Sequence, residues 1–366
     1  MAKRIIISGG GTGGHIFPAI AIANALKKID AKTEILFVGA KGKMEMEKVP
    51  AAGYSIIGLD IQGLQRSSIT KNLLLPLKII KSVMKSLKII KNFKPDAVVG
   101  VGGYASGPLL FAASLKNIPY LIQEQNSYAG MTNKYLAKNA KKVCVAFDDM
   151  STFFPADKIV KTGNPVRRES VNIEGKLGEA ASFFDLETTK KTILVIGGSL
   201  GAGTLNTSMM AGLTQLQEAG IQVIWQTGKY YYNGVMEKFG NQPKDSGIRI
   251  YEFLNRMDLA YAMADVIISR AGAGTISELC LIKKPVLLVP SPNVVDDHQT
   301  KNAHALINKE AAILISDKHA ESELIDQTLK LLANEEQMKL ISERIGALGL
   351  PHADEQIAHE ILKIAI

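Results

Sequence analysis

A histidine ends a glycine-rich turn near the start of the chain, and its position suits acid–base chemistry. A short isoleucine run leads into residues 9–15, Gly-Gly-Gly-Thr-Gly-Gly-His. Apolar residues at helical spacing from Ile16 to Leu26 predict that a helix begins here, with Pro18 in its first turn. A helix N-terminus favours an anion such as phosphate and disfavours the imidazolium form of His15. A neutral imidazole can act as a general base near pH 7, although a histidine here can also simply cap or pack the helix.

The spacing Gly9-x-Gly11-x-x-Gly14 matches the dinucleotide-binding fingerprint formally. That fingerprint requires an acidic residue after the second strand to bind a ribose hydroxyl. Here the predicted strand 34–38 runs into Gly-Ala-Lys-Gly-Lys at 39–43, without an acid. The sequence therefore does not favour a nicotinamide dinucleotide.

Similar turns and polar clusters follow other predicted strands. Glycine turns at 102–107 and 197–203 each lead into a predicted helix and could cradle an anion. A polar cluster, residues 123–126, follows the apolar strand at 120–122, at the edge where parallel sheets bind ligands. In the turn at 272–278, Thr275-x-x-Glu278 fits a capping box, but Glu278 could equally accept two vicinal ribose hydroxyls.

The repeated order of strand, glycine turn and helix predicts an α/β fold. The theme restarts after Gly-Asn-Pro-Val-Arg at 163–167, a sequence that disfavours helix and marks a boundary. We therefore predict two Rossmann-like, doubly wound domains, residues 1–163 and 164–350, facing each other across a ligand cleft. The last segment, 351–366, is predicted to be an amphipathic helix that can pack back on the first domain.

Composition bounds the class of protein. The chain has 366 residues, 46% of them hydrophobic, and a net charge of +8, which is typical of a globular protein with two full cores. Its two cysteines, Cys144 and Cys280, have no metal-ligand spacing and indicate a reducing compartment. Neither a signal peptide nor a stretch apolar enough to span a membrane is expected.

A lysine-rich segment concentrates much of the positive charge. Seven lysines and no acid lie between Lys71 and Lys94, and from Lys78 onward they are predicted to line one helical face. A leucine run at 73–77 precedes this stripe. Such a helix suits an anionic membrane surface, although a solvated lysine face over a packed core is the ordinary alternative. The lysines lack aromatic interleaving, so nucleic acid is not an expected partner.

Taken together, seven motifs in this order resemble those of the MurG family, which transfers N-acetylglucosamine (GlcNAc) from UDP-GlcNAc to undecaprenyl-diphospho-N-acetylmuramoyl-pentapeptide. The resemblance covers essentially the whole chain. The motifs are the turn at 9–15, Gly-Gly-Tyr-x-Ser-Gly-Pro at 102–108, Glu-Gln-Asn at 124–126, the boundary at 163–167, Gly-Gly-Ser at 197–199, the turn at 272–278 and the loop at Gln299. It implies a GT-B fold, an inverting hexosyltransferase, a place in peptidoglycan synthesis and thereby in cell shape and division, and a peripheral position on the cytoplasmic face of the inner membrane.

The resemblance also implies roles for particular residues. His15 would be the catalytic base, Glu278 would bind the ribose and Gln299 the GlcNAc hydroxyls, while Leu254 would offer its backbone to the uracil. The lipid diphosphate would lie on the glycine turns, at Gly11, Gly103, Tyr104 and Ser106. The remaining substrate-binding positions are Thr12, Gly13, Gly14, Asn126, Arg167, Ser199, Ala273, Gly274, Thr275, Ile276 and Ser277.

The sequence departs from the family at Gln123, where some members carry histidine, and this leaves His15 as the candidate base. No metal site is implied and no cofactor is required, although a divalent cation that escorts the diphosphate remains compatible. Besides the two substrates, the family's role would bring cell-wall synthesis proteins as further partners.

Two other classes of function stay open from the residues alone. Gly197-x-Ser199-x-Gly201 matches the nucleophile elbow of a serine hydrolase, with Asp265 and His298 as later acid and base. A non-catalytic nucleotide-binding protein at a membrane surface would keep the glycine turns but would not need His15.

Overall fold

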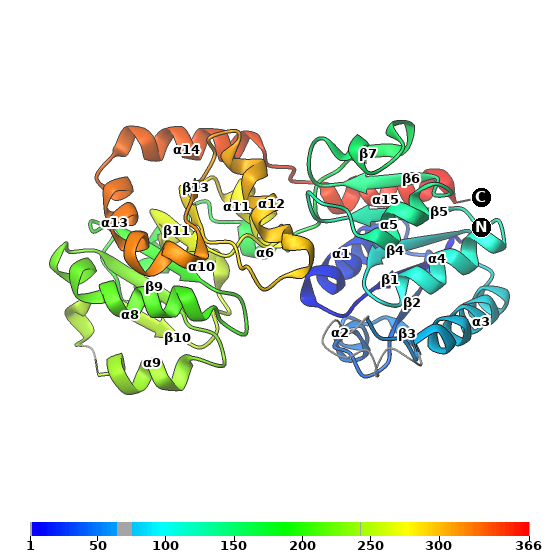
Figure 1. Ribbon diagram of the computed structural model, residues 1–366, viewed down its shortest axis with the longest axis horizontal. Coiled ribbons are helices and arrows are strands. Elements are labelled where there is room, and N and C mark those ends of the chain that lie inside the picture. The colour runs from blue at the N-terminus through cyan, green and yellow to red at the C-terminus, as the bar shows by residue number, and fades with distance from the viewer. Residues whose placement is uncertain (1, 64–74, 242, 366) are drawn as a thin grey trace. The chain divides into compact units, whose positions relative to one another are not determined.

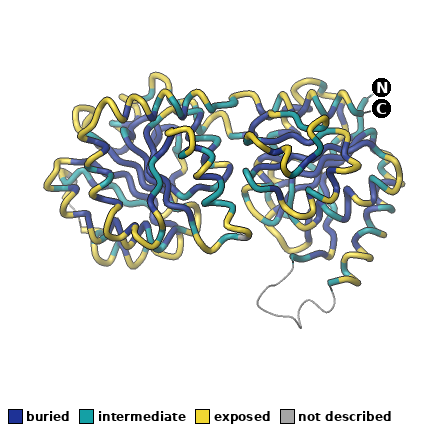
Figure 2. The backbone as a smooth tube through the Cα atoms, turned by 45° about the horizontal axis from the view of Figure 1, so that its top comes forward, coloured by how far each residue is buried: buried dark blue, intermediate teal, exposed yellow. Residues whose placement is uncertain are grey.

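The computed structural model describes residues 2–63, 75–241 and 243–365, which form two compact units. Unit 1 comprises Met1–Val166 together with Pro351–Ile366, and unit 2 comprises Arg167–Leu350. In each unit, helices flank a central sheet (Figure 1). Buried strands occupy the centre of each unit and the exposed residues lie on the surrounding helices and loops (Figure 2).

The sheet of unit 1 has the order β3-β2-β1-β4-β5-β6-β7, and its strand pairs are parallel. Its strands are β1 (Arg4–Gly9), β2 (Glu34–Ala40), β3 (Ser55–Leu59), β4 (Ala97–Gly102), β5 (Tyr120–Glu124), β6 (Lys142–Val145) and β7 (Ile159–Lys161). Its helices are α1 (Gly13–Ile29), α2 (Glu45–Ala51), α3 (Leu75–Phe93), α4 (Ser106–Leu115), α5 (Met131–Ala137) and α15 (Ala353–Ile364), with short 3₁₀ turns at Met150–Thr152 and Ala156–Lys158.

Alternation along the strands divides the core of unit 1 into two layers. On one face, Ile5 and Ile7 of β1 pack with α1, α2 and α15. On the other face, Ile6 packs with α3, α4 and α5. The C-terminal helix α15 therefore completes a layer that begins with the first strand of the chain.

The sheet of unit 2 has the order β10-β9-β8-β11-β12-β13, again with parallel pairs. Its strands are β8 (Thr192–Ile196), β9 (Gln222–Gln226), β10 (Ile248–Tyr251), β11 (Val266–Ser269), β12 (Val286–Leu288) and β13 (Ile313–Leu314). Its helices are α6 (Arg168–Val171), α7 (Leu177–Phe184), α8 (Gly203–Glu218), α9 (Tyr232–Phe239), α10 (Met257–Met263), α11 (Ala273–Ile282), α12 (His298–Ile307), α13 (Ala320–Leu332) and α14 (Glu335–Ala347), with 3₁₀ turns at Lys244–Ser246, Val295–Asp297 and Asp317–His319.

Both sheets reverse their direction of strand addition at one point, between β1 and β4 in unit 1 and between β8 and β11 in unit 2. In doubly wound sheets, ligands bind beyond the carboxyl ends of the strands at such a switch point. The glycine turns predicted from the sequence follow these four strands. The fold class is therefore confirmed: each unit is a Rossmann-like, doubly wound domain.

Two local predictions need correction, and a third falls partly outside the described residues. Helix α1 begins at Gly13, so Pro18 lies in its second turn and not its first. The lysines of α3 do not form one solvated face, because Lys78 lies near Asp60 (Nζ–Oδ1 3.4 Å) and Lys85 donates to the Gly58 carbonyl (2.6 Å). The leucine run at 73–77 lies partly outside the described residues, which resume at Leu75.

Candidate active site

The two glycine turns of unit 1 meet at its switch point because the residues in contact, Gly10, Gly102 and Gly103, lack side chains. Gly10 N–H donates to the Gly102 carbonyl (3.3 Å), which ties the β1–α1 loop to the end of β4. A Cβ added to Gly103 would lie 2.3 Å from the Gly10 carbonyl oxygen, so a larger residue cannot stand there without moving the loop. The close approach brings the segments predicted to bind the acceptor into one site.

His15, in the first turn of α1, lies against this pair of loops. Its Nδ1 is 3.1 Å from the Gly10 carbonyl oxygen and 3.3 Å from Thr12 Oγ1, and a Cβ on Gly102 would lie 2.8 Å from Nε2. A carbonyl only accepts hydrogen bonds, so the contact with Gly10 requires a proton on Nδ1. In the neutral ring Nε2 then carries the lone pair, which is the protonation state that a general base needs.

The four residues predicted for the acceptor diphosphate have different surroundings. Gly11 N–H donates to Glu45 Oε2 (2.9 Å), and Tyr104 is exposed. The Ser106 hydroxyl is buried and has no hydrogen-bond partner among the described residues, and the Ser106 backbone N–H donates to the Gly103 carbonyl (3.3 Å). The first-turn N–H groups at Gly13 and Gly14 precede the intrahelical bonds of α1, so they are the donors best suited to an anion.

The polar cluster after β5 is held by a buried carboxylate. Glu124 accepts from Asn126 N–H (3.1 Å), Gly130 N–H (3.2 Å) and Asn133 Nδ2 (2.8 Å). These bonds fix the loop that presents Asn126 at the same sheet edge as His15. Gln123 is fully buried and donates to Asn164 Oδ1 (2.8 Å), so its place is structural.

In unit 2 one glutamine joins two predicted nucleotide contacts. Gln226 Nε2 donates to the Gly198 carbonyl (3.1 Å), and its Oε1 accepts from Leu254 N–H (2.9 Å). The exposed Ser199 follows Gly198 directly. Because the Leu254 N–H already donates to Gln226, the Leu254 carbonyl is the backbone group that could bind the uracil. Gln226 was not predicted from the sequence.

The Glu278 carboxylate lies near the first turn of α11 with a buried tyrosine. Helix α11 begins at Ala273, after Gly272, so Thr275 is inside the helix and the predicted capping box is wrong. Tyr261 OH donates to Glu278 Oε2 (2.9 Å). Burial raises the pKa of the Glu278 carboxyl, whereas the Tyr261 hydroxyl and the charge of Arg167 act in the opposite direction.

Among the other predicted residues of this turn, the Ile276 side chain is in the core and Ser277 Oγ donates to the Ala273 carbonyl (3.0 Å). Gly274 is exposed.

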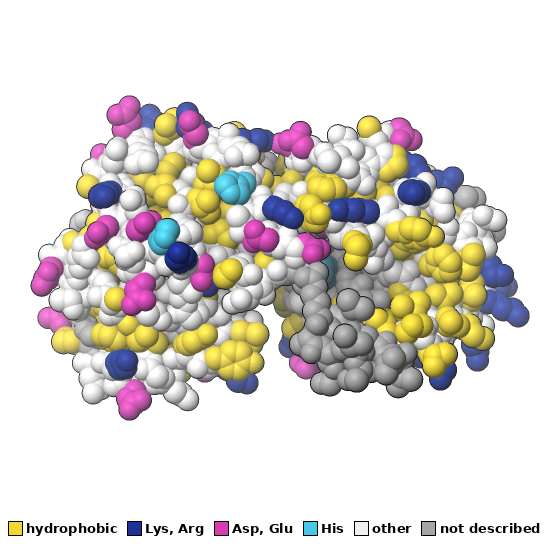
Figure 3. Space-filling view, viewed as in Figure 1, with side chains coloured by type: hydrophobic (Ala, Val, Ile, Leu, Met, Phe, Trp, Pro, Cys, Tyr) yellow, Lys and Arg dark blue, Asp and Glu magenta, His cyan; other side chains and the backbone are white. Residues whose placement is uncertain are grey.

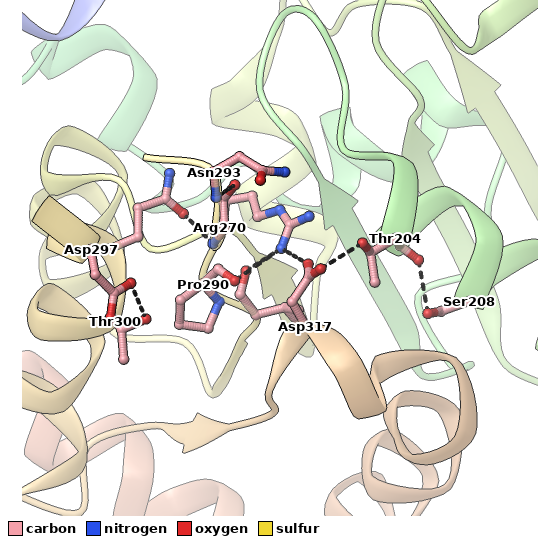
Figure 4. Close-up of polar contacts among 11 residues, drawn as sticks. Thr204, Ser208, Arg270, Pro290, Asn293, Asp297, Thr300 and Asp317 are labelled. Atoms are coloured by element: carbon pink, nitrogen blue, oxygen red, sulfur yellow. Dashed lines mark hydrogen bonds and ion pairs between the residues drawn. The ribbon is translucent and has the colours of Figure 1, made fainter. Parts of the chain in front are cut away.

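A half-buried arginine connects the loops around this edge (Figure 4). Arg270 follows β11 and donates to the Val289 carbonyl (2.9 Å) and to Asp317. Asp317 Oδ2 in turn accepts from Thr204 Oγ1 (3.0 Å), at the start of α8. The structure places Gln299 in the first turn of α12 and not in a loop. Its Oε1 accepts from Ser291 N–H (2.9 Å), so the amide nitrogen of Gln299 is the end that could donate to a sugar hydroxyl.

The geometry separates the residues of the hydrolase hypothesis. Ser199 follows the carboxyl end of β8, whereas Asp265 accepts from Thr192 N–H (2.8 Å) at the start of that strand. Five extended residues span about 16 Å, so the two side chains cannot form a catalytic pair. Within the described part of the chain, no cluster of three histidine, cysteine or acidic side chains could hold a metal ion.

Comparison with known proteins agrees with this architecture. Two Rossmann-like domains with ligand loops at both switch points define the GT-B class of glycosyltransferases. The profile of the glycosyltransferase family 28 N-terminal domain matches residues 5–145, and that of the family 28 C-terminal domain matches residues 192–357. A crystal structure of MurG from Acinetobacter baumannii is similar, with a TM-score of 0.81 and 32% identity over 99% of both chains. UDP-GlcNAc 2-epimerase from Neisseria meningitidis shares the fold alone, with a TM-score of 0.67 and 15% identity over 99% of this chain and 100% of the other.

Relatives of the same length are more similar in sequence. A UDP-N-acetylglucosamine–N-acetylmuramyl-(pentapeptide) pyrophosphoryl-undecaprenol N-acetylglucosamine transferase from Parabacteroides distasonis is 54% identical, covering 99% of this chain and 98% of the relative. The transferase of the same name from Bacteroides thetaiotaomicron is 53% identical with the same coverage. The chain therefore belongs to the MurG family of glycosyltransferases.

Proposed function

We propose that the protein transfers GlcNAc from UDP-GlcNAc to the 4-hydroxyl of undecaprenyl-diphospho-N-acetylmuramoyl-pentapeptide, the step that makes lipid II for peptidoglycan. The observation that carries this proposal is the identity above 50% over whole chains with transferases of that name. No cofactor is needed for such a displacement, because UDP is already a good leaving group.

In this reaction the acceptor oxygen attacks C1 of GlcNAc, the bond from C1 to the UDP oxygen breaks, and the configuration inverts. His15 Nε2 takes the hydroxyl proton as the attack proceeds. The hydrogen bond from Nδ1 to the Gly10 carbonyl supports this role by keeping the lone pair on Nε2. N–H groups near Gly13 and Gly14 suit the lipid diphosphate, beside Asn126 and Tyr104.

Unit 2 supplies the groups for the donor. Ser199 and the N–H groups of its loop suit the departing diphosphate, and the carbonyl of Leu254 suits the uracil. Glu278, oriented by Tyr261, accepts from the two ribose hydroxyls, with the charge of Arg167 nearby. Gln299 donates to the sugar, and the first turn of α11 closes around the nucleotide.

We further propose that the protein docks on the cytoplasmic face of the inner membrane through α3 and α4. Among the described helices, none is long and apolar enough to cross a bilayer. Helix α3 exposes Leu77, Ile80 and Met84, and α4, which packs beside it, exposes Phe111 and Leu115. Figure 3 shows hydrophobic side chains gathered on this part of unit 1, with Lys and Arg at the adjacent edge. We call these five residues the α3–α4 surface.

Lysines flank the α3–α4 surface as an anionic membrane requires. Lys81 and Lys88 are exposed on α3, next to Met84 in the helical spacing. Apolar insertion and lysine attraction together suit a peripheral enzyme whose acceptor stays in the bilayer. The same position would let cell-wall synthesis proteins act on the product.

The direct test is UDP release that requires both UDP-GlcNAc and a lipid-linked muramoyl acceptor. His15→Ala should lower kcat by roughly 10²–10⁴, the usual contribution of a general base, while the Kd for UDP-GlcNAc stays unchanged. Nucleotide binding without turnover in the wild-type protein would instead support a binding protein. Turnover of His15→Ala close to the wild-type value would remove His15 from the base role.

A further inference from the structure

One buried carboxylate near the site has no part in the mechanism described so far. Glu45 stands at the first position of α2 and is only 1% exposed. Its Oε1 accepts from Ala40 N–H (2.9 Å) and its Oε2 accepts from Gly11 N–H (2.9 Å). The loop fits closely around it, since a Cβ on Gly10 would lie 2.2 Å from Glu45 Oε1. Burying a carboxylate costs free energy unless such hydrogen bonds satisfy it, so we asked what the buried Glu45 carboxylate does at this place.

The Gly11 N–H that binds Glu45 belongs to the same peptide group as the Gly10 carbonyl that His15 contacts. The two groups point in opposite directions across a trans peptide. Glu45 therefore acts on one end of this peptide and His15 Nδ1 on the other. Hydrogen bonds in such a chain polarise one another, and a negative charge at the N–H end makes the carbonyl a stronger acceptor.

We propose that Glu45 is a positioning residue for His15, acting through the Gly10–Gly11 peptide. The carboxylate holds that peptide with its carbonyl toward the imidazole, and this fixes the proton on Nδ1 and the lone pair on Nε2. The arrangement performs the task of a carboxylate bound directly to a catalytic histidine, with one peptide group inserted between them. The effect on catalysis rests on the proposed role of His15, whereas the effect on the imidazole does not.

Glu45 also defines where the acceptor's diphosphate can lie. A second anion cannot take the Gly11 N–H without displacing the carboxylate, and the two charges would repel each other. The diphosphate is therefore directed to the first turn of α1, past Thr12. Glu45 thus separates the part of the turn that orients the base from the part that binds the substrate.

The test compares Glu45→Gln with Glu47→Gln in the full-length protein. Glutamine has the same size but one carbonyl oxygen and no charge, so it cannot accept both N–H groups. Glu47 lies on the same helix with an exposed side chain and pairs with Lys48, so its variant is the matched control. Nitrogen-15 NMR of labelled histidine reports which ring nitrogen of His15 carries the proton, and steady-state kinetics reports kcat and KM.

We expect wild-type His15 to be protonated on Nδ1 in its neutral form, and Glu45→Gln to raise the fraction protonated on Nε2. The kcat of Glu45→Gln should fall about 10- to 100-fold, while KM for UDP-GlcNAc stays within about twofold. This loss in kcat is in the range seen when the hydrogen-bond partner that orients a metal-binding histidine is removed. Glu47→Gln should leave both signals unchanged. A purely structural role for Glu45 would change stability without changing the tautomer.

Two results would overturn the proposal. The first is an Nε2–H tautomer in the wild-type protein, which is decisive even if Glu45→Gln does not fold. The second is a folded Glu45→Gln variant with the wild-type tautomer and kcat. Failure of the proposed function looks different, because the wild-type protein would then release no UDP while the tautomer signal of His15 could still follow Glu45.

Discussion

At the scale of single residues, hydrogen bonds to the backbone orient much of the candidate site. Glu124 and Gln226 each hold two loop segments together, and Tyr261 orients Glu278. Such supporting residues give a site its precision, because a base or a hydrogen-bond acceptor misplaced by 1 Å can lose most of its effect. Single substitutions in the site should therefore distinguish residues that bind a substrate from residues that act in the reaction itself.

Glu278 and Gln299 are expected to differ in the ligand that they affect. Glu278→Ala should weaken UDP and UDP-GlcNAc alike, by about 10- to 100-fold, because the ribose is common to both and the lost bonds are charge-assisted. Gln299→Ala should weaken UDP-GlcNAc by up to about tenfold and leave UDP nearly unchanged. Isothermal titration with both ligands measures the difference.

The control for this comparison is Tyr261→Phe, which keeps the ring and removes the hydroxyl that orients Glu278. It should reduce the affinity for UDP less than Glu278→Ala does. Equal weakening of both ligands by Gln299→Ala would contradict the division between ribose and sugar contacts. Thermal melts of each variant show whether a loss of affinity reflects a loss of folded protein.

The sequence predicted the glycine turns and the candidate base, because glycine, proline and strand patterns act over a few residues. It did not predict Glu45, which sits in the polar stretch Lys-Gly-Lys-Met-Glu-Met-Glu-Lys and looks like a solvated acid. Its burial depends on the loop after β2 folding against the loop after β1, which are more than 30 residues apart. The capping box at Thr275 failed for a related reason: the N-cap of helix α11 is Gly272, three residues before Thr275.

At the scale of secondary-structure elements, the orientation of α3 determines which side chains the proposed membrane-docking surface exposes. The sequence pattern suggested a lysine face opposite an apolar core face. In the structure, Ser82 and Ser86 lie on the buried side, where Ser86 Oγ donates to the Ser82 carbonyl (2.8 Å), while Ile80 and Met84 are exposed. Small serines let the helix approach the sheet closely, and their polarity concealed the packed face in the sequence.

Binding to anionic vesicles should depend on the exposed part of this helix. We expect Lys81→Glu combined with Lys88→Glu to reduce vesicle binding at low salt, because each lysine near the surface contributes about 1 kcal/mol. Leu77→Ser combined with Met84→Ser should remove the part of binding that survives high salt. Co-sedimentation at two salt concentrations separates these contributions.

The matched control is Lys330→Glu combined with Lys339→Glu, two exposed lysines on α13 and α14 of unit 2. This pair makes the same change in net charge and should keep vesicle binding substantially higher. Turnover of a short-chain, soluble acceptor should be similar in all these variants. Undiminished binding of both α3 variants would assign the docking surface to another part of the protein.

A second prediction at this scale concerns the link between α7 and α10 in unit 2. Asp258 accepts from Arg256 Nε (2.9 Å) and from Lys176 Nζ (2.7 Å), and these bonds hold the pKa of its carboxyl far below the usual range despite partial burial. A depressed pKa stabilises the folded protein above the unfolded-state value of about 3.9, and this stabilisation is lost as the pH falls below it.

Asp258→Asn should therefore cost about 1–3 kcal/mol at pH 7, the range for hydrogen bonds to charged groups. The difference in the free energy of unfolding between wild type and variant should shrink as the pH is lowered from 5 toward 3. Urea denaturation at several pH values measures this difference. A difference that stayed constant over that interval would show that the carboxylate charge is not what stabilises the contact.

At the scale of the whole molecule, the chain leaves unit 1 after Val166 and returns to it at Pro351. The buried face of α15, formed by Ile357, Ala358 and Ile361, packs in the core layer that also contains Ile5 and Leu26. The predicted alternation of strands, glycine turns and helices within each domain followed from local pattern. The sequence predicted a helix at 351–366 that can pack back on the first domain. Its partners Ile5 and Leu26 lie more than 300 positions earlier in the chain, and no local pattern identifies them.

Ile357→Ala should destabilise unit 1 by about 2–5 kcal/mol, because it leaves a cavity in a fully buried position. The units can unfold separately, so hydrogen exchange measured strand by strand is the suitable readout. We expect faster exchange in β1 and α1 with little change in β8 and β11. Leu340→Ala, at a side chain 40% exposed on α14, is the control and should change neither unit by more than about 0.5 kcal/mol. Equal loss of protection in both units after Ile357→Ala would contradict the assignment of α15 to unit 1.

The return of the chain to unit 1 has a consequence for synthesis on the ribosome. Translation proceeds from the N-terminus, and domains generally fold as units when their last element has emerged. Here unit 1 is begun first but completed after unit 2, since α15 is synthesised only after Leu350, the last residue of unit 2. All residues of unit 2 are therefore synthesised before α15. Until α15 emerges, the apolar face of α1 in the partly formed unit 1 stays uncovered. A cell making this protein therefore has an interval in which a chaperone that binds apolar surface has a defined target. That interval ends when α15 emerges and packs on unit 1.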